Sequence, residues 1–185
     1  FVCVAPQALA QSGSAILEEV VVTATRRAES AQDVAVALTA LSAQSLEDAN
    51  VVDITDIGFL APNVQLQPVS TFPGFATFTM RGIGTGGNSI RTLDPTVNVM
   101  VDGMVLATQI AGQLDAFDYE AVEVLRGPQG IFFGRNSIAG AIQMRTGKPS
   151  EEFVGRIKVG VGSHSLAQFE GVIEGAMSSL SLIHI

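Results

Sequence analysis

The sequence predicts an α+β domain, with a small mixed sheet, short helices and long loops, followed by two longer strands of a different character. Helix-capping residues at Ser42 and Asp53 each precede a short segment that soon meets a helix-ending signal. Residues 122–146 combine a short alternating strand with glycine-rich turns. From Phe153 onward, apolar and polar residues alternate over about ten residues per strand.

Composition narrows the classes of protein. Hydrophobic residues form 47% of the 185-residue chain, which is ample for a buried core. The net charge of -8, with the ten Lys and Arg residues spread along the chain, argues against a nucleic-acid partner. No apolar run approaches the ~18 residues of a membrane-spanning helix, so contact with a bilayer would require a barrel.

The first ten residues resemble the end of a signal peptide, because an apolar region leads into Ala8-Leu9-Ala10. We therefore expect the mature chain to begin at Gln11. Removal of residues 1–10 takes away Cys3, the only cysteine, and leaves no disulfide or thiol nucleophile. The alternative is a buried N-terminal strand.

Residues 11–33 are predicted to form an extension ahead of the domain. Within them, residues 18–27 concentrate β-branched side chains, which favour an extended backbone. Such a segment can add as a strand to the sheet of another protein. The candidate residues are Val20, Val21, Val22, Thr23, Ala24 and Thr25. The alternative is a first strand of the domain's own sheet, and the two states can alternate.

The next elements are predicted from caps and alternation. Residues 34–41 favour a strand, although their alanines also suit a helix. Ser42 is the expected N-cap of a short helix that ends near Asn50. Asp53 caps a second helix, with Asp56 at its third position, and an Ala-Pro pair ends it.

Two alternating strands, 63–67 and 75–81, lead into a glycine-rich loop. The loop is not a phosphate-binding loop, because it lacks Gly-Lys-Ser/Thr and stays turn-like up to Pro95. Residues 95–101 and 104–106 are predicted to form a hairpin around a type I′ Asp-Gly turn. A polar loop at 108–112 and a helical turn within 114–120 are expected to follow.

The stretch 122–146 is predicted to be the compact centre of the domain. Val122, Val124 and Arg126 alternate with two other residues before a Gly-Pro pair stops the strand. The glycines that follow are expected to supply positive φ or close backbone approach. The apolar side chains that we expect to be buried are Ile131, Phe132, Phe133, Ile138 and Ile142.

This stretch resembles the plug-domain signature of TonB-dependent outer-membrane receptors. The matching segments are VEVLRGPQG, FGRNSIAGAI, the strand that ends in Arg145-Thr146, and VDGMVL near residue 103. The resemblance covers most of residues 18–176. The signature residues are Arg81, Gly82, Asp102, Gly103, Arg126, Gly127, Pro128, Gly130, Gly134, Arg135, Gly140 and Arg145.

The resemblance implies a plug at 34–149 inside a barrel of about 22 strands, in the outer membrane of a Gram-negative bacterium. It implies import of a scarce small ligand, most often an iron chelate of the siderophore type, with cobalamin and glycans as other options. The 20–25 run resembles the TonB box, so a TonB-type energy-coupling protein is the implied partner. Apical loop residues implied to face the ligand are Thr85, Gly86, Gly87, Asn88, Ser89 and Arg91.

Residues 150–179 are predicted to form the first barrel hairpin, with an apolar face toward lipid and a polar face toward the lumen. Two strands cannot close a barrel, so we expect the sequence to be part of a longer chain. Residues 180–185 resemble a non-native tail, and a genuine third strand is the alternative.

Catalysis is not expected. One histidine would remain between the proposed processing site and the tail, and there is no Gly-x-Ser-x-Gly elbow or His/Cys zinc spacing, so we predict no catalytic residue, metal or cofactor. At least some of the arginines Arg81, Arg126, Arg135 and Arg145 are expected to pair with carboxylates when buried. The resemblance suggests glutamates of the barrel wall as partners for some of them. The rival function is a soluble periplasmic interaction module, which the full open reading frame would distinguish.

Overall fold

A mixed five-stranded sheet forms the centre of the domain in the computed structural model, which describes residues 21–23, 29–69, 75–85, 94–106, 118–163, 167–178 and 181–184. In spatial order its strands are β3 (Ala37–Ser42), β9 (Tyr119–Arg126), β10 (Gly140–Thr146), β7 (Val97–Val101) and β8 (Met104–Val105). Neighbouring strands are antiparallel except β10 and β7, which are parallel. The sheet therefore joins strands that are far apart in the sequence.

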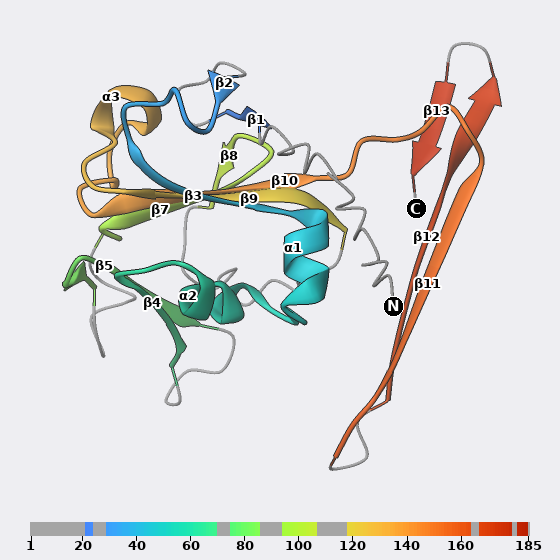
Figure 1. The fold of residues 1–185 in the computed structure, drawn as a ribbon, viewed down its shortest axis with the longest axis horizontal. Coiled ribbons are helices and arrows are strands. Elements are labelled where there is room, and N and C mark those ends of the chain that lie inside the picture. Colours follow the sequence, from blue (N-terminus) through green and yellow to red (C-terminus); the bar gives the residue numbers. More distant parts are fainter. Residues whose placement is uncertain are drawn as a thin grey trace, which may run out of the picture.

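Both faces of this sheet are covered (Figure 1). The pleat sends Val122 and Val124 to one face and Glu123 and Leu125 to the other, and all four residues are buried. We call the first the helical face and the second the N-terminal face, after the elements that cover them. A sheet covered on both sides explains why β9 has buried side chains on both sides of its alternation.

The helical face packs against three short helices and a second sheet. The helical segments are α1 (Ala43–Asp48), η1 (Ile54–Asp56) and α2 (Ile57–Leu60), and the sheet has the order β4 (Val64–Pro68), β5 (Ala76–Met80) and β6 (Ile83–Gly84). Leu46, Ile54, Ile57 and Phe78 of these elements meet Ile142 of β10 in one core cluster. This cluster is apolar throughout.

The predicted caps are confirmed. Ser42 accepts a hydrogen bond from the backbone N–H of Ser45 at 3.3 Å at the start of α1. Asp53 and Asp56 form a capping box at the start of η1. The strand at 34–41, for which a helix was the alternative, is β3, displaced by a few residues. Asp102 (φ 49°) and Gly103 (φ 80°) form the expected hairpin turn between β7 and β8.

The N-terminal face is covered by β1 (Val21–Val22), β2 (Glu29–Ser30) and α3 (Gly130–Phe133). Apolar residues of the sheet and of the segments that cover this face form a second, smaller core cluster. It contains Val22, Val34, Met100, Leu125, Phe133 and Ala141.

Two predicted elements are wrong in part. Ile83 and Gly84 belong to the expected glycine-rich loop but pair with β5 as β6. The expected helical turn within 114–120 is contradicted at Tyr119 and Glu120, which begin β9; most of that segment, and the loop at 108–112, lie outside the described residues. The turn after Gln129 contains the single-turn helix α3.

Burial in the stretch 122–146 also differs from expectation. Phe133 and Ile142 are buried and Phe132 is half-buried, but Ile131 is 94% and Ile138 65% exposed. Ile131 lies on the outer side of α3, where one helical turn can bury only one side. Apolar residue type alone therefore did not identify the buried set.

The glycines of this stretch divide into two kinds. Gly134 has φ 73°, which favours glycine, and a β-carbon on Gly140 would overlap the carbonyl oxygen of Leu125 and the Sδ of Met80. Gly130 instead begins α3, and a β-carbon there would meet nothing within 4 Å. The expectation that Gly130 requires glycine is therefore wrong.

A three-stranded antiparallel sheet follows the domain, with β11 (Val154–Val161), β12 (Ala167–Ser178) and β13 (Ser181–His184). In the predicted hairpin, Ile157 and Val159 lie opposite Gly171 and Phe169 on one face. Lys158 lies opposite Glu170 on the other. Within the expected tail, residues 181–184 pair with β12 as β13, which agrees with the alternative of a third strand.

Candidate functional site

The predicted strand-adding segment is docked on its own domain. Val21 and Val22 pair antiparallel with Glu29 and Ser30, and the side chain of Val22 is fully buried in the cluster on the N-terminal face. The alternative that the sequence left open was a first strand of the domain's own sheet, whereas β1 pairs with β2 in a separate two-stranded sheet. Val20, Ala24 and Thr25 of the same segment lie outside the described residues.

Thr23 fixes this segment to the sheet through three hydrogen bonds. Its backbone N–H and its hydroxyl both donate to Oε1 of Glu123, at 2.8 and 3.1 Å. The Nε2 group of Gln143 donates to the Thr23 hydroxyl oxygen at 3.1 Å. We call Thr23, Glu123 and Gln143 the Thr23 anchor.

Strand register explains why the two sheet residues of the anchor meet. Glu123 of β9 lies directly opposite Gln143 of β10. Both alternate with Val122, Val124, Ile142 and Met144, which fill the helical face. Glu123 and Gln143 therefore point to the N-terminal face, where β1 lies, and Glu123 is only 2% exposed.

Arg145 places a positive charge beside the anchor. Its guanidinium lies 3.3 Å from a carboxylate oxygen of Glu120 and 3.8 Å from Oε1 of Glu123. This confirms for Arg145 the expectation that a partly buried arginine pairs with carboxylates. Arg126 instead donates to the backbone oxygens of Pro62 (3.1 Å) and Leu38 (3.2 Å).

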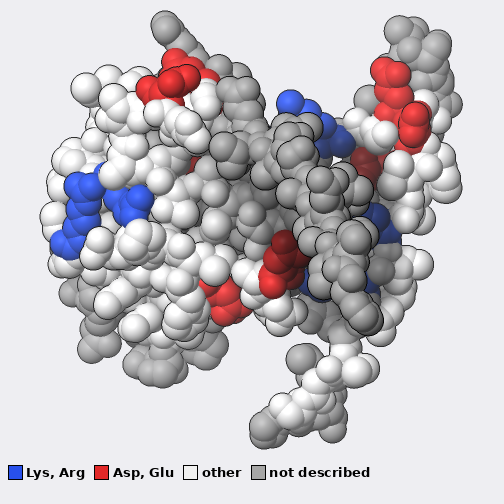
Figure 2. Space-filling view, viewed as in Figure 1, with Lys and Arg blue, Asp and Glu red and all other residues white. Residues whose placement is uncertain are grey.

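The other signature arginines lie at the surface. Arg81 and Arg135 are exposed and form no ion pair within the part of the chain that the structure describes. Figure 2 shows acidic and basic side chains in separate small groups on this face of the molecule, without one continuous basic stripe. Among the residues that the structure describes, no group of three His, Cys, Asp or Glu side chains is placed to hold a metal ion.

The predicted ligand-facing loop is only partly described. Gly86, Gly87, Asn88, Ser89 and Arg91 lie outside the described residues. Thr85, the remaining candidate, is 7% exposed next to β6. Its side chain is thus turned away from solvent in this conformation.

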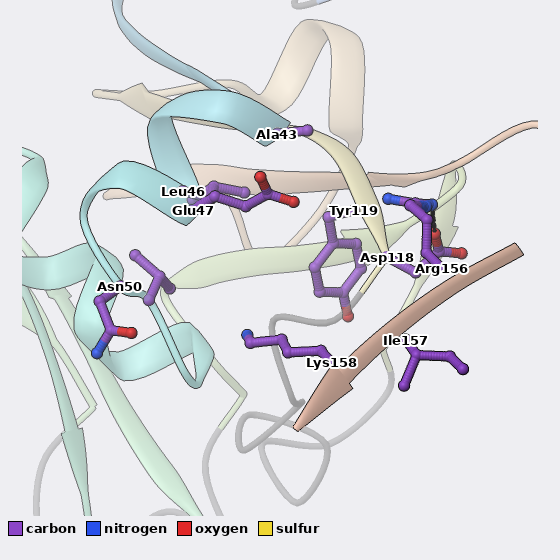
Figure 3. Close-up of a pocket in the computed structure, with 10 residues that line it drawn as sticks. Ala43, Leu46, Glu47, Asn50, Asp118, Tyr119, Arg156, Ile157 and Lys158 are labelled. Atoms are coloured by element: carbon purple, nitrogen blue, oxygen red, sulfur yellow. Dashed lines mark hydrogen bonds and ion pairs between the residues drawn. The ribbon is translucent and has the colours of Figure 1, made fainter. Parts of the chain in front are cut away.

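A cavity of about 400 Å³ lies between α1, the start of β9 and strand β11 (Figure 3). Its charged lining is mixed, with Glu47 and Asp118 beside Arg156 and Lys158. Arg156 pairs with Asp118 at 2.5 Å and links the hairpin to the domain. No sequence pattern indicates this cavity, because it is formed by three segments that are far apart in the chain.

Helices of the described residues are all too short or too polar to cross a bilayer.

Residues 30–141 match the TonB-dependent Receptor Plug Domain family. The chain is 32% identical over 145 residues to the pesticin receptor of Yersinia pestis, which covers 77% of this chain and 21% of the receptor. It is 28% identical over 134 residues to the vitamin B12 transporter BtuB of Vibrio vulnificus, covering 70% of this chain and 20% of the transporter.

Solved structures give the same fold. The ferric yersiniabactin uptake receptor FyuA from Yersinia pestis has a TM-score of 0.70 at 27% identity, over 78% of this chain and 22% of that chain. The ferripyoverdine receptor of the outer membrane of Pseudomonas aeruginosa, bound to ferripyoverdine, has a TM-score of 0.70 at 22% identity, over 85% and 20%, and supports the fold alone. The chain spans about a fifth of the length of these relatives.

Proposed function

The chain belongs to the TonB-dependent receptor plug domain family, and from this premise we propose that it gates an outer-membrane transporter driven by a TonB-type energy-coupling protein. The relatives are receptors and transporters of the Gram-negative outer membrane, which agrees with a non-catalytic role in that membrane. The plug would close a barrel supplied by the rest of the receptor, and the hairpin β11–β12 would be its first strands.

We propose a ferric siderophore-type chelate as the imported nutrient. The support is the ferric yersiniabactin uptake receptor among the structural relatives, at 27% identity. The vitamin B12 transporter at 28% identity keeps cobalamin as the second candidate. Binding of each compound to the full-length receptor would distinguish them.

The observation that carries the coupling role is the docked strand β1. Its backbone pairs with only the two residues of β2, and its side-chain contacts end at Thr23 among the described residues. Strand addition to a partner's sheet uses backbone N–H and C=O groups of this segment, and in the docked state some of these groups bond to β2 and to Glu123. Docking on the plug and binding to the partner are therefore alternative states of one segment.

Replacement of Val22 by proline tests the coupling role. Val22→Pro removes a backbone donor and fixes φ, so the segment can no longer add as a regular strand. In the full-length receptor on whole cells, we expect the ligand to bind at the surface and uptake to be lost. The measurement compares surface-bound with internalised ligand.

Val22→Ala is the matched control, because it shortens the same side chain but keeps the backbone donor. We expect it to retain uptake. Undiminished uptake by the proline variant would rule out this segment as the coupling strand. Lost ligand binding would assign the segment to the plug's own sheet.

A further inference from the structure

We propose that Glu123 is the residue that holds the coupling strand in its docked state, so that loss of its bonds to Thr23 frees the strand. This inference rests on the proposed function and adds a regulatory residue to it. Glu123 would act as a positioning residue, since it controls the strand through Thr23.

The hydrogen-bond geometry places most of the directional hold on Glu123. One carboxylate oxygen accepts both the backbone N–H and the hydroxyl of Thr23, and hydrogen bonds to a charged group are about twice as strong as neutral ones. Gln143 adds one neutral bond at 3.1 Å. The burial of Val22 is apolar and does not by itself fix the position of the backbone along the sheet.

A second hydrogen bond on the same face shows how a neutral side chain differs from the charged Glu123. Asn98 of β7 donates from its side-chain amide to the carbonyl oxygen of Phe133 at 3.2 Å, which fastens α3 to the sheet. That bond is neutral and buried, and α3 is joined to β9 by only three residues. A glutamate is the more costly residue to bury, so its presence beneath Thr23 calls for a paired charge or donor.

Arg145 makes the docking reversible. Its guanidinium is shared between Glu120 and Glu123, while Oε2 of Glu123 is buried without a hydrogen bond among the described residues. When Thr23 leaves, the Glu123 carboxylate still has a positive partner 3.8 Å away. The undocked state is thereby spared an unpaired buried charge.

The test measures exposure of residue 22 in the full-length receptor in isolated outer membranes, without ligand or partner. A Val22→Cys substitution, as the only reactive thiol, is fully buried when β1 is docked and reacts with a maleimide when it is not. We expect Glu123→Ala to raise the labelling rate at least about tenfold, because it removes the acceptor of both hydrogen bonds that Thr23 donates.

Glu120→Ala is the matched control. Glu120 lies on the same strand and pairs with the same arginine, but it does not contact Thr23. We expect its labelling rate to stay within about twofold of the parent, because Glu120 is exposed and an ion pair screened by solvent contributes little. Glu123→Gln keeps an acceptor oxygen but not the charge, so it should restore part of the protection.

Thr23→Val keeps the inference testable if Glu123→Ala disturbs the sheet, because Thr23 lies outside the sheet and loses only its hydroxyl contacts. We expect an intermediate labelling rate. Equal rates for the parent, Thr23→Val and Glu123→Ala would overturn the role of Glu123, as would equal acceleration by Glu120→Ala. Because labelling requires no transport, this failure is distinct from undiminished uptake by Val22→Pro, which would refute the coupling role instead.

Discussion

The two faces of the central sheet are built from alternate residues of the same strands, yet they differ in kind. The helical face presents Val122, Val124, Ile142 and Met144 to an apolar cluster. The N-terminal face mixes apolar residues with polar ones such as Glu123, whose contacts depend on direction. Apolar packing on the first face suits permanent structure, while directional contacts on the second suit a segment that docks in one position and can leave.

Gly140→Val should cause the largest loss of stability, because it disrupts packing at the centre of the sheet. Even the first added carbon would overlap the backbone oxygen of Leu125 and the Sδ of Met80, so β10 cannot keep its place between its neighbours. We expect a loss of stability of about 5 kcal/mol, enough to unfold the domain. Urea unfolding of the purified chain measures it.

Gly130→Val is the matched control for this glycine. Gly130 is helical and has open space where the side chain would be added. We expect its urea midpoint to stay close to that of the parent. A larger loss at Gly130 than at Gly140 would show that the close approach has been placed at the wrong glycine.

Ile142→Ala should have the next largest effect. Ile142 is fully buried on the helical face, so its truncation leaves a cavity and lowers the free energy of unfolding by about 3 kcal/mol. The N-terminal strand should stay docked in the remaining folded molecules, because the substitution lies on the opposite face. Faster labelling of Val22→Cys without loss of global stability would contradict the separation of the two faces.

Gln143→Ala should have the smallest effect and change only the N-terminal face. It removes one neutral hydrogen bond to Thr23, worth about 1 kcal/mol, from docking of β1. We expect labelling of Val22→Cys to rise severalfold while the urea midpoint scarcely moves. A matching fall in global stability would show that the anchor is part of the permanent core.

Local patterns predicted local structure well. The caps at Ser42 and Asp53, the Asp102-Gly103 turn and the alternation after Phe153 were all visible, because each depends on a few neighbouring residues. Exposure of Ile131 was not predictable in this way, since it depends on which side of α3 meets the sheet.

Of the candidate site, the sequence predicted the N-terminal segment but not the sheet residues on which it docks. The run that contains Val22 and Thr23 was identified from its β-branched residues, but its docking partner was missed. The available signal was Glu123 itself, a carboxylate between two valines that both proved buried. Its role depends on Gln143 lying opposite in register, and on a strand 100 positions earlier reaching the same face.

The position of β10 has a consequence for the order in which the chain folds. β10 is the last strand of the sheet to be synthesised, yet it lies inside the sheet between β9 and β7. Until residue 146 emerges, β7 lacks its parallel neighbour, and β3 must wait for β9. Strands left open in this way invite pairing with other chains, and long-range closure is slow. Incorrect pairing of this domain is therefore most favoured before the strand that completes the sheet is available.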